Sequence, residues 1–390
     1  ALWAIPLVYF LLVAAEFVAM THVAFVLTRQ HFSATAVGFV ATLMWLGIFS
    51  GSMLASHVTP RFGREATFRR CVQALVLCFA LIALTQGYWP WALLGYALGV
   101  VVGVIWVTGE AWLAEIAPPD RRGYYVGLFE TCVGIGMMTG PVLLALIDRA
   151  GWPPLWIAFG MGLVTLAAGR LLPHTAANAL PGIEDTYNDK PVDQYPWKGL
   201  LLGIAGVSLI SGLLESGSAA MLPGLSLRLG FSVQQAAWLG AVIGAGSALL
   251  QTPAGHLSDR VGQHRILLAC WVVLVLSSAV LGIWGQDHHL VLWLAGFVFG
   301  GMGGVIYTLA MVELGHKLQG KVLVHATSVL VVCYTAGSAS GPVLGGWLFD
   351  RGGLVWLAAG LGSTAMVGLG LSVWRSRAHA MRPDRVGARP

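Results

Sequence analysis

Charged residues are scarce in this chain of 390 residues. Asp, Glu, Lys and Arg make up only 10% of the sequence, whereas a soluble domain carries about 25%. Hydrophobic residues make up 57% and the mean hydropathy is +0.77, which excludes a soluble globular domain and a disordered chain. The 51 glycines and 16 tryptophans point the same way, because glycine lets transmembrane helices approach closely and tryptophan favours the bilayer surface. This composition predicts a membrane protein.

Cysteine is also rare, and its placement excludes two kinds of site. None of the five cysteines belongs to a CxxC pair, and all lie in apolar segments, so neither a disulfide framework nor a zinc site is indicated. We interpret them as packing residues. The chain starts inside an apolar run that has no basic residues before it and contains Glu16. We therefore interpret this run as a first membrane span rather than a cleavable signal.

The basic residues are dispersed between apolar runs instead of forming a patch. The pI of 9.1 and the net charge of +5 therefore do not indicate a nucleic-acid partner. Sorting the 22 Lys and Arg residues among the connections leaves only four on one side of the membrane, namely Arg29, Arg149, Arg228 and Arg351. The positive-inside rule then predicts that both termini are cytoplasmic. We expect the bacterial inner membrane as the location.

Twelve long apolar runs alternate with short polar clusters. A run of about 20 apolar residues spans a bilayer as a helix, because a lone spanning segment must satisfy its own backbone hydrogen bonds. The sequence therefore predicts an all-α membrane protein with transmembrane helices near 5–28, 36–56, 70–88, 91–115, 124–146, 154–172, 200–226, 233–255, 266–285, 290–315, 323–347 and 354–374. We divide it into a six-helix bundle (1–172), a cytoplasmic linker (173–199), a second six-helix bundle (200–374) and a cytoplasmic tail (375–390).

The two halves repeat one another. Glu16 and Glu215 differ by 199 positions, as do Ser33 and Ser232, and Gly63 and Gly262; Trp106 and Tyr307 differ by 201, as do Pro141 and Pro342. Parallel repeats of this kind build transporters that rock two bundles around a site near the bilayer midplane. The repeat therefore predicts two pseudo-symmetric halves with a substrate site between them.

The segment from Gly255 to Arg265 resembles a loop signature of the major facilitator superfamily. Its functional positions are Asp259, Arg260, Gly262 and Arg265, and the first half has Pro60 where the pattern expects Asp. The resemblance covers the whole chain and implies the twelve-helix fold of that superfamily and secondary transport. We expect Asp259 to accept bonds from exposed amides at the helix start near Val322, as a latch of the outward-facing state.

Two further segments, ending in Gly140-Pro141 and Gly341-Pro342, resemble the GxxxGP signature of the same superfamily. This signature implies antiport, with a proline bend as a pivot; close helix packing by the small residues is the alternative. More narrowly, Glu215, residues 251–260 and residues 109–113 resemble the bacterial YcaD-like branch.

Ionisable groups inside the predicted spans mark the candidate site. Glu16 and Glu215 each lie 13 residues before an external arginine, which is about 20 Å of helix and places both near mid-membrane. A carboxyl group there that alternates between charged and neutral forms suits proton coupling. The alternative is a protonated glutamate bonded to a neighbouring backbone group.

Glu110 and Glu130 lie nearer the cytoplasmic side. They have a role in proton release or gating, or else form local ion pairs with Arg121 and Arg122. Candidate substrate ligands are the residues predicted to line the central cavity, namely Glu16, His22, Trp106, Glu215, Tyr307 and Tyr334. Metal binding is not predicted, because no second His or Met accompanies His22 at helical spacing.

These features predict a proton-coupled secondary active transporter. No Lys or Arg occupies the middle of a span, so a neutral or cationic small organic solute is favoured over an anion. Efflux by antiport is the leading direction, and import of a vitamin, siderophore or metal complex is the alternative. A membrane-embedded enzyme is disfavoured, since no HExxH, GxSxG or Walker motif occurs. A sensor or channel is the other less favoured class, and the two-half repeat and the latch loop argue against a channel. The expected partners are the solute and the lipid bilayer, the expected state is a monomer, and the proton gradient replaces any cofactor.

Overall fold

The computed structural model describes residues 4–116, 122–171, 197–317 and 320–380. Within these ranges all regular structure is helical. The α-helices are α1 (Ala4–Arg29), α2 (Ala34–Phe62), α3 (Arg64–Leu84), α4 (Tyr88–Ile116), α5 (Arg122–Ala150), α6 (Pro154–Ala168), α7 (Trp197–Arg228), α8 (Val233–Val261), α9 (Gln263–Trp284), α10 (His289–Lys317) and α11 (Gly320–Ala380). A short 3₁₀ turn, η1 (Gly169–Leu171), extends α6.

The longest helix, α11, consists of two arms. Non-helical backbone at Gly352 and at Gly353, which has φ 64° and ψ −153°, divides it. Counting both arms, the described residues contain all twelve predicted helices, and the predicted all-α fold is confirmed. The helix boundaries differ at α7, which begins at Trp197, inside the predicted linker; the linker residues 173–196 lie outside the described residues.

The repeat seen in the sequence reappears in how helices begin and end. The hydroxyl oxygen of Ser33 accepts a bond from the amide of Ala36, and that of Ser232 accepts one from the amide of Gln235. Such caps satisfy amides that the first helical turn leaves without partners. Single glycines, Gly63 and Gly262, connect α2 to α3 and α8 to α9 with φ of 78° and 101°, a region that favours glycine.

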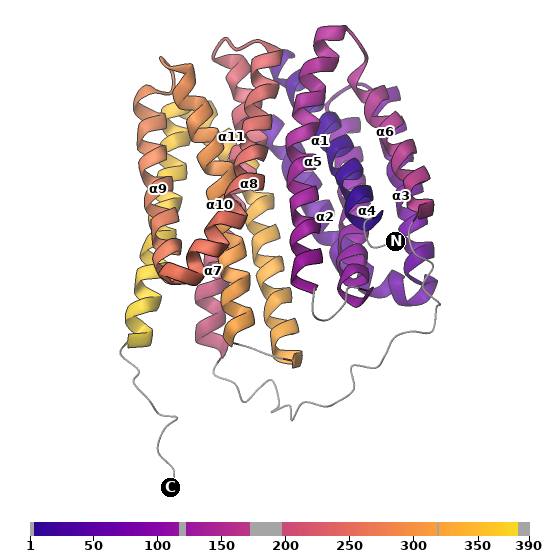
Figure 1. The fold of residues 1–390 in the computed structure, drawn as a ribbon. Coiled ribbons are helices and arrows are strands. Elements are labelled where there is room, and N and C mark those ends of the chain that lie inside the picture. Colours follow the sequence, from indigo (N-terminus) through magenta and orange to yellow (C-terminus); the bar gives the residue numbers. More distant parts are fainter. Residues whose placement is uncertain (1–3, 117–121, 172–196, 318–319, 381–390) are drawn as a thin grey trace.

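The helices form one bundle whose halves meet mainly along two helix pairs, with smaller contacts of α7 with α1 and α2. Figure 1 shows α1–α6 (indigo to magenta) beside α7–α11 (pink to yellow), with α5 and α8 adjacent. The other pair is α2 and α11. Glycines permit both approaches: the backbone of Gly38 on α2 lies against the Pro342 carbonyl, and a Cβ on Gly244 of α8 would lie 2.7 Å from the Met138 amide nitrogen of α5.

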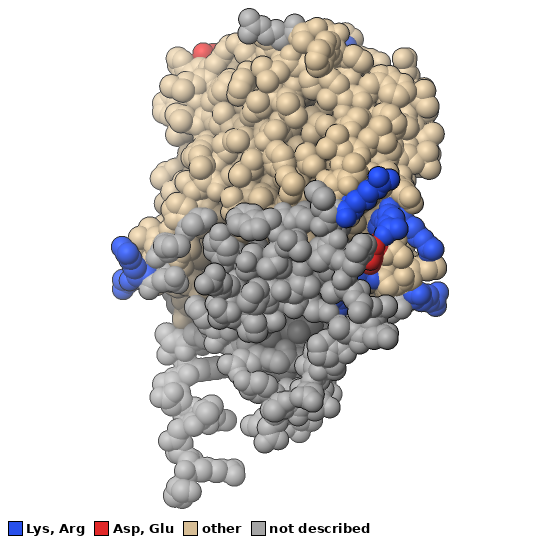
Figure 2. Space-filling model, turned by 45° about the vertical axis from the view of Figure 1, so that its right-hand side comes forward, with Lys and Arg blue, Asp and Glu red and all other residues tan. Residues whose placement is uncertain are grey.

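The surface carries the apolar band of a membrane protein. Figure 2 shows a broad surface without charged side chains, and Lys and Arg side chains that gather toward its lower part. Ten helical stretches in the described ranges are long and apolar enough to cross a bilayer; one of them, Val329–Ser376, comprises both arms of α11, and α6 is shorter. Large apolar side chains on the outside include Leu77, Leu93, Leu276, Ile283 and Val367.

Candidate functional site

Glu215 is buried on α7 and is held by three helices. One carboxylate oxygen accepts a hydrogen bond of 3.0 Å from the hydroxyl of Tyr334 on α11. Gly303 of α10 packs on the stem of Glu215, since a Cβ on this glycine would lie 2.7 Å from the Glu215 Cβ. One turn earlier, the Ser211 hydroxyl donates to the Gly303 carbonyl at 2.7 Å. Sequence and packing therefore fix this carboxylate in place.

Two aromatic rings flank the ring of Tyr334. The Tyr307 ring lies 4.5 Å from the Tyr334 ring in a tilted arrangement, and the Trp45 ring of α2 lies 6.3 Å from it, edge to face. We call Glu215, Tyr307, Tyr334 and Trp45 the Glu215 cluster. Because Trp45 belongs to the other half, the cluster reaches the boundary between the halves. The sequence carried no signal for Trp45, which has glycine at its repeat position.

Glu16, the repeat equivalent of Glu215, is equally buried but has different surroundings. It is 5% exposed, and its carboxyl group makes no hydrogen bond to a described residue. The adjoining residue Phe17 packs against Gly140 of α5. The predicted pair is therefore not equivalent in polar contacts.

Trp106 and His22, two further predicted ligands, are not part of the Glu215 cluster. The Trp106 ring lies edge to face against Tyr9 and Phe129, at 6.1 and 5.9 Å, in an aromatic group of the first half. The Tyr9 hydroxyl of this group donates to the Ile105 carbonyl. His22 is half-buried on α1. The structure thus joins Tyr307 and Tyr334 to Glu215 and packs Trp106 elsewhere.

The two GxxxGP motifs occupy matching positions. Gly140 packs on α1 and Gly341 packs on α7, each within its own half. The following proline lies at the boundary in both cases: the Pro141 ring packs on Gly240 of α8, and the Pro342 carbonyl lies against α2. The motif therefore joins tight packing inside a half to contact across the halves.

Other predicted residues are only partly described. The side chains of Glu110, Glu130 and Asp259 lie outside the described residues, while Arg260 and Arg265 are exposed and Gly262 forms the α8–α9 connection. The latch expected between Asp259 and the helix start near Val322 therefore stays a prediction.

A second polar cluster joins the halves at the end of the bundle where α1–α2, α7–α8 and the two arms of α11 are connected; we call this the distal end. The Asp350 carboxylate of α11 accepts bonds from the amides of Ala34 and Thr35 at 2.8 and 2.7 Å, and from the Thr35 hydroxyl at 2.6 Å. Arg228 of α7 lies 3.3 Å from Asp350 and also donates to the Phe32 carbonyl. We call these residues the distal clamp.

The clamp keeps Asp350 ionised. Burial by itself would raise its pKa, but the bonds from Thr35 and Ala34, together with the charge of Arg228, lower the pKa below the usual 3.8. The first amides of a helix favour an anion, and here the helix belongs to the opposite half. In the sequence, Arg228 served to mark the topology and the depth of Glu215, and no pattern pointed to Asp350.

Contacts between the halves continue from the clamp toward the Glu215 cluster. Gly346 lies against the Ala34 carbonyl, Gly38 against Pro342, and the Thr42 hydroxyl donates to the Ala339 carbonyl at 2.6 Å. Trp45 and Tyr334 follow. These contacts all lie between the distal end and the middle of α2, so the halves are closed on the distal side of Glu215.

Comparisons with known proteins agree with this architecture. The profile of the Major Facilitator Superfamily matches residues 6–203 and 204–389. The "Uncharacterized MFS-type transporter YcaD" of Escherichia coli is 25% identical over 336 residues, covering 85% of this chain and 84% of that protein. The "Uncharacterized MFS-type transporter YfkF" of Bacillus subtilis is 24% identical over 347 residues, covering 85% and 87%.

Solved structures show the same fold at low sequence identity. A D-xylose–proton symporter superposes with a TM-score of 0.76 at 16% identity, over 95% of this chain and 97% of that one. The nucleoside transporter NupG has a TM-score of 0.72 at 12% identity, over 96% and 98%. The protein is a multi-pass membrane transporter rather than an enzyme. Its repeated halves, its helix pairing and the match along both halves establish that the chain belongs to the Major Facilitator Superfamily.

Proposed function

We propose that this protein is a proton-coupled secondary transporter of a small neutral or cationic organic solute, with the Glu215 cluster as its coupling and binding centre. The observation that supports it is the buried Glu215 carboxylate, hydrogen-bonded to Tyr334, whose ring contacts Trp45 of the opposite half. A change at the carboxylate therefore reaches the boundary that must open during transport.

Protonation supplies the link between charge and conformation. An ionised carboxylate out of water needs hydrogen-bond donors, and Tyr334 provides one. When a proton neutralises Glu215, this requirement weakens and the Tyr334 ring is freer to move away from Trp45. The halves then separate at less cost on the distal side of the cluster.

The cluster also favours a class of solute. Tyr307, Tyr334 and Trp45 offer ring faces and edges to an organic ligand, and a carboxylate beside aromatic rings suits an amine or a neutral hydroxylated compound. Transfer of an anion to this place is unfavourable without a cationic partner. The similar solved structures are named as nucleoside and D-xylose transporters, so their fold accommodates neutral solutes.

The remaining parts of the proposal concern direction and placement. We place the protein in a bacterial inner membrane as a monomer with both termini cytoplasmic, and with no cofactor beyond the proton gradient. The distal clamp then closes the outer side, and the site faces the cytoplasm. Efflux by antiport is favoured by the two GxxxGP motifs at the boundary; import of a vitamin, siderophore or metal complex is the alternative.

Secondary roles complete the proposed cycle. Glu16, Glu110 and Glu130 assist proton movement, and His22 and Trp106 contact solute when the cavity opens. Asp259, Arg260, Gly262 and Arg265 latch the halves in the opposite conformation. Gly140-Pro141 and Gly341-Pro342 are the pivots, since each proline lies at the boundary.

Transport by purified protein in liposomes tests the proposal. An imposed pH gradient should drive accumulation or extrusion of a solute from a panel of amines, nucleosides and sugars. Glu215→Gln should abolish gradient-driven transport but retain solute exchange, while Asp287→Asn on the α9–α10 connection serves as the control. Normal gradient-driven transport by Glu215→Gln would contradict the assigned coupling role.

A further inference from the structure

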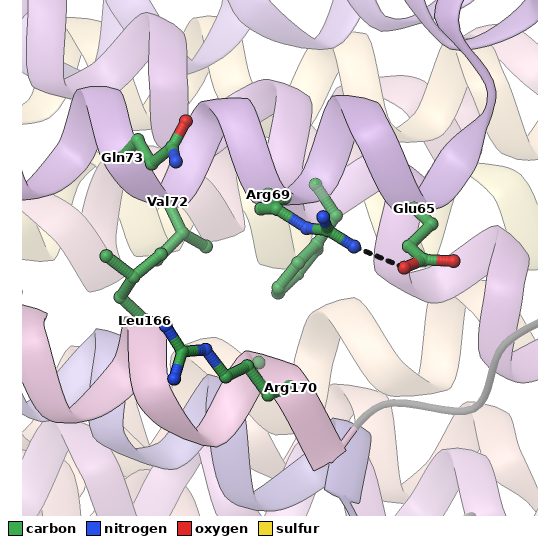
Figure 3. A pocket seen from close by; sticks show the side chains of 8 residues that line it. Glu65, Arg69, Val72, Gln73, Leu166 and Arg170 are labelled. Carbon is green, nitrogen blue, oxygen red and sulfur yellow. Dashed lines mark hydrogen bonds and ion pairs between the residues drawn. The ribbon is translucent and has the colours of Figure 1, made fainter.

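A cavity of about 310 Å³ opens between α3 and the end of α6, away from the boundary between the halves. Figure 3 shows the Arg69 side chain running along α3 to Glu65, and the Arg170 side chain on the facing segment across the cavity. Arg69 lies near the start of α3 and Arg170 in η1. The cavity therefore lies at the opposite end of the bundle from the distal clamp, at the level where these helices leave the apolar band.

The two arginines give the cavity an excess of positive charge. Arg69 pairs with Glu65 one turn earlier on α3, and its side chain is 61% exposed, so this ion pair contributes little to stability. Arg170 forms no ion pair with any residue that the structure describes. Two guanidinium groups that line one cavity from different segments are suited to bind a phosphate group.

Apolar residues line much of the rest of the cavity, beside Glu65 and Gln73, and exposed apolar side chains continue from it along the outside of the bundle. Phe68, Val72 and Leu166 form its wall. One turn beyond the cavity, α3 exposes Leu77 and α6 exposes Leu163, and both belong to the apolar surface. A ligand with a charged head and apolar tails therefore matches the whole surface, whereas inorganic phosphate would leave the wall uncovered.

We propose that this cavity binds the phosphate of an anionic phospholipid, whose acyl chains lie along α3 and α6. Arg69 and Arg170 hold the headgroup, and Phe68, Val72 and Leu166 cover the start of the chains. Gly169 keeps the space open, because a Cβ there would meet only Phe68, at 3.8 Å. Basic pockets between transmembrane helices near the membrane surface are known to suit such headgroups.

Native mass spectrometry of the purified full chain tests this site. The protein in detergent is titrated with phosphatidylglycerol, with phosphatidylcholine of the same acyl chains, and with inorganic phosphate. One phosphatidylglycerol molecule should be retained preferentially, and excess phosphate should not displace it. Equal retention of phosphatidylcholine, or displacement by phosphate alone, would overturn the assignment.

Three variants separate charge, space and nonspecific effects. Arg69→Gln with Arg170→Gln should lower phosphatidylglycerol affinity by about 25-fold, since one basic residue near a membrane surface contributes about fivefold. Gly169→Leu should lower it by filling the cavity while both charges remain; its backbone, with φ −57°, accepts a side chain. Arg70→Gln, on the same turn but stacked on Phe62, is the charge-matched control and should bind as wild type. Equal loss in all three, or no loss in Gly169→Leu, would contradict the site.

Discussion

The two halves have the same helical plan but differ in polarity around their first helices. In the second half, hydroxyl groups of α7 donate to backbone carbonyls of neighbouring helices: Ser208 to Leu330, Ser211 to Gly303 and Ser216 to Ser338. The repeat positions on α1 are occupied by Tyr9, Leu12 and Phe17, of which only Tyr9 carries a hydroxyl group, which donates to the Ile105 carbonyl.

This difference extends to the two buried glutamates. Glu215 has Tyr334 as a donor, whereas Glu16 has no hydrogen-bond partner among the described residues. Ionisation inside a protein is costly unless donors receive the charge. The repeat in sequence therefore does not make the two residues equal, and we expect proton coupling to depend mainly on the second half.

The largest expected effect is the difference in proton-driven transport between variants of the two glutamates. Glu215→Gln should remove proton-driven solute accumulation, because an amide cannot release a proton, while Glu16→Gln should retain most of it. Uptake into liposomes under an imposed pH gradient measures both. Loss of accumulation in both variants would show that the halves share the coupling, and loss in Glu16→Gln alone would reverse the comparison.

Two hydrogen-bonding tyrosines sharpen the contrast. Tyr334→Phe removes the donor to a carboxylate, and a bond to a charged group contributes about 1.5–3 kcal/mol; it should therefore slow gradient-driven transport by roughly tenfold or more. Tyr9→Phe removes a donor to the Ile105 carbonyl and should cost about 1 kcal/mol of stability, without a comparable loss of transport. Initial rates and unfolding in detergent–denaturant mixtures distinguish them. Similar transport losses would place the Tyr9 aromatic group in the mechanism.

The distal clamp should respond to acid. The folded-state pKa of Asp350 is lowered. Its contribution to the stability of the clamp is therefore complete above pH of about 4 and is lost as pH falls through the folded-state pKa. Asp350→Asn should destabilise the clamp by about 1 kcal/mol, comparable to the loss of a helix cap. The cost is no larger because solvent screens this charge. Distances between spin labels on the distal ends of α2 and α11 should increase, independently of pH between 6 and 8. Unchanged distances would exclude Asp350 as a clamp residue.

The smallest expected effect concerns the repeated helix caps. Ser33 caps α2 with its hydroxyl alone, whereas Ser232 forms a reciprocal pair of bonds with Gln235. Ser33→Ala should therefore cost about 0.5 kcal/mol and Ser232→Ala about 1 kcal/mol of unfolding free energy. Reversible unfolding in mixed micelles measures both values. A larger cost for Ser33→Ala would indicate that this cap also supports the nearby distal clamp.

Several site features followed from the sequence and others did not. Glu215, Tyr307 and Tyr334 were predicted because a charge inside an apolar run and aromatic residues on cavity-lining helices are visible in one dimension. Trp45 was missed, since a tryptophan in a membrane helix has no distinguishing pattern. Trp106 was predicted as a ligand by its repeat relation to Tyr307, but it packs against the rings of Tyr9 and Phe129 within the first half.

The sequence alone determined the helices, the repeat and several of the positions where helices begin and end. These are local properties: apolar length sets a span, Ser33 and Ser232 satisfy nearby amides, and Gly63 and Gly262 permit a positive φ. Tertiary structure decided which glutamate has a donor and which charge closes the bundle. Glu215 meets Tyr334 across 119 residues and Thr35 meets Asp350 across 315. Such contacts depend on how complete helices pack, because a side chain's partner comes from whichever helix lies opposite it.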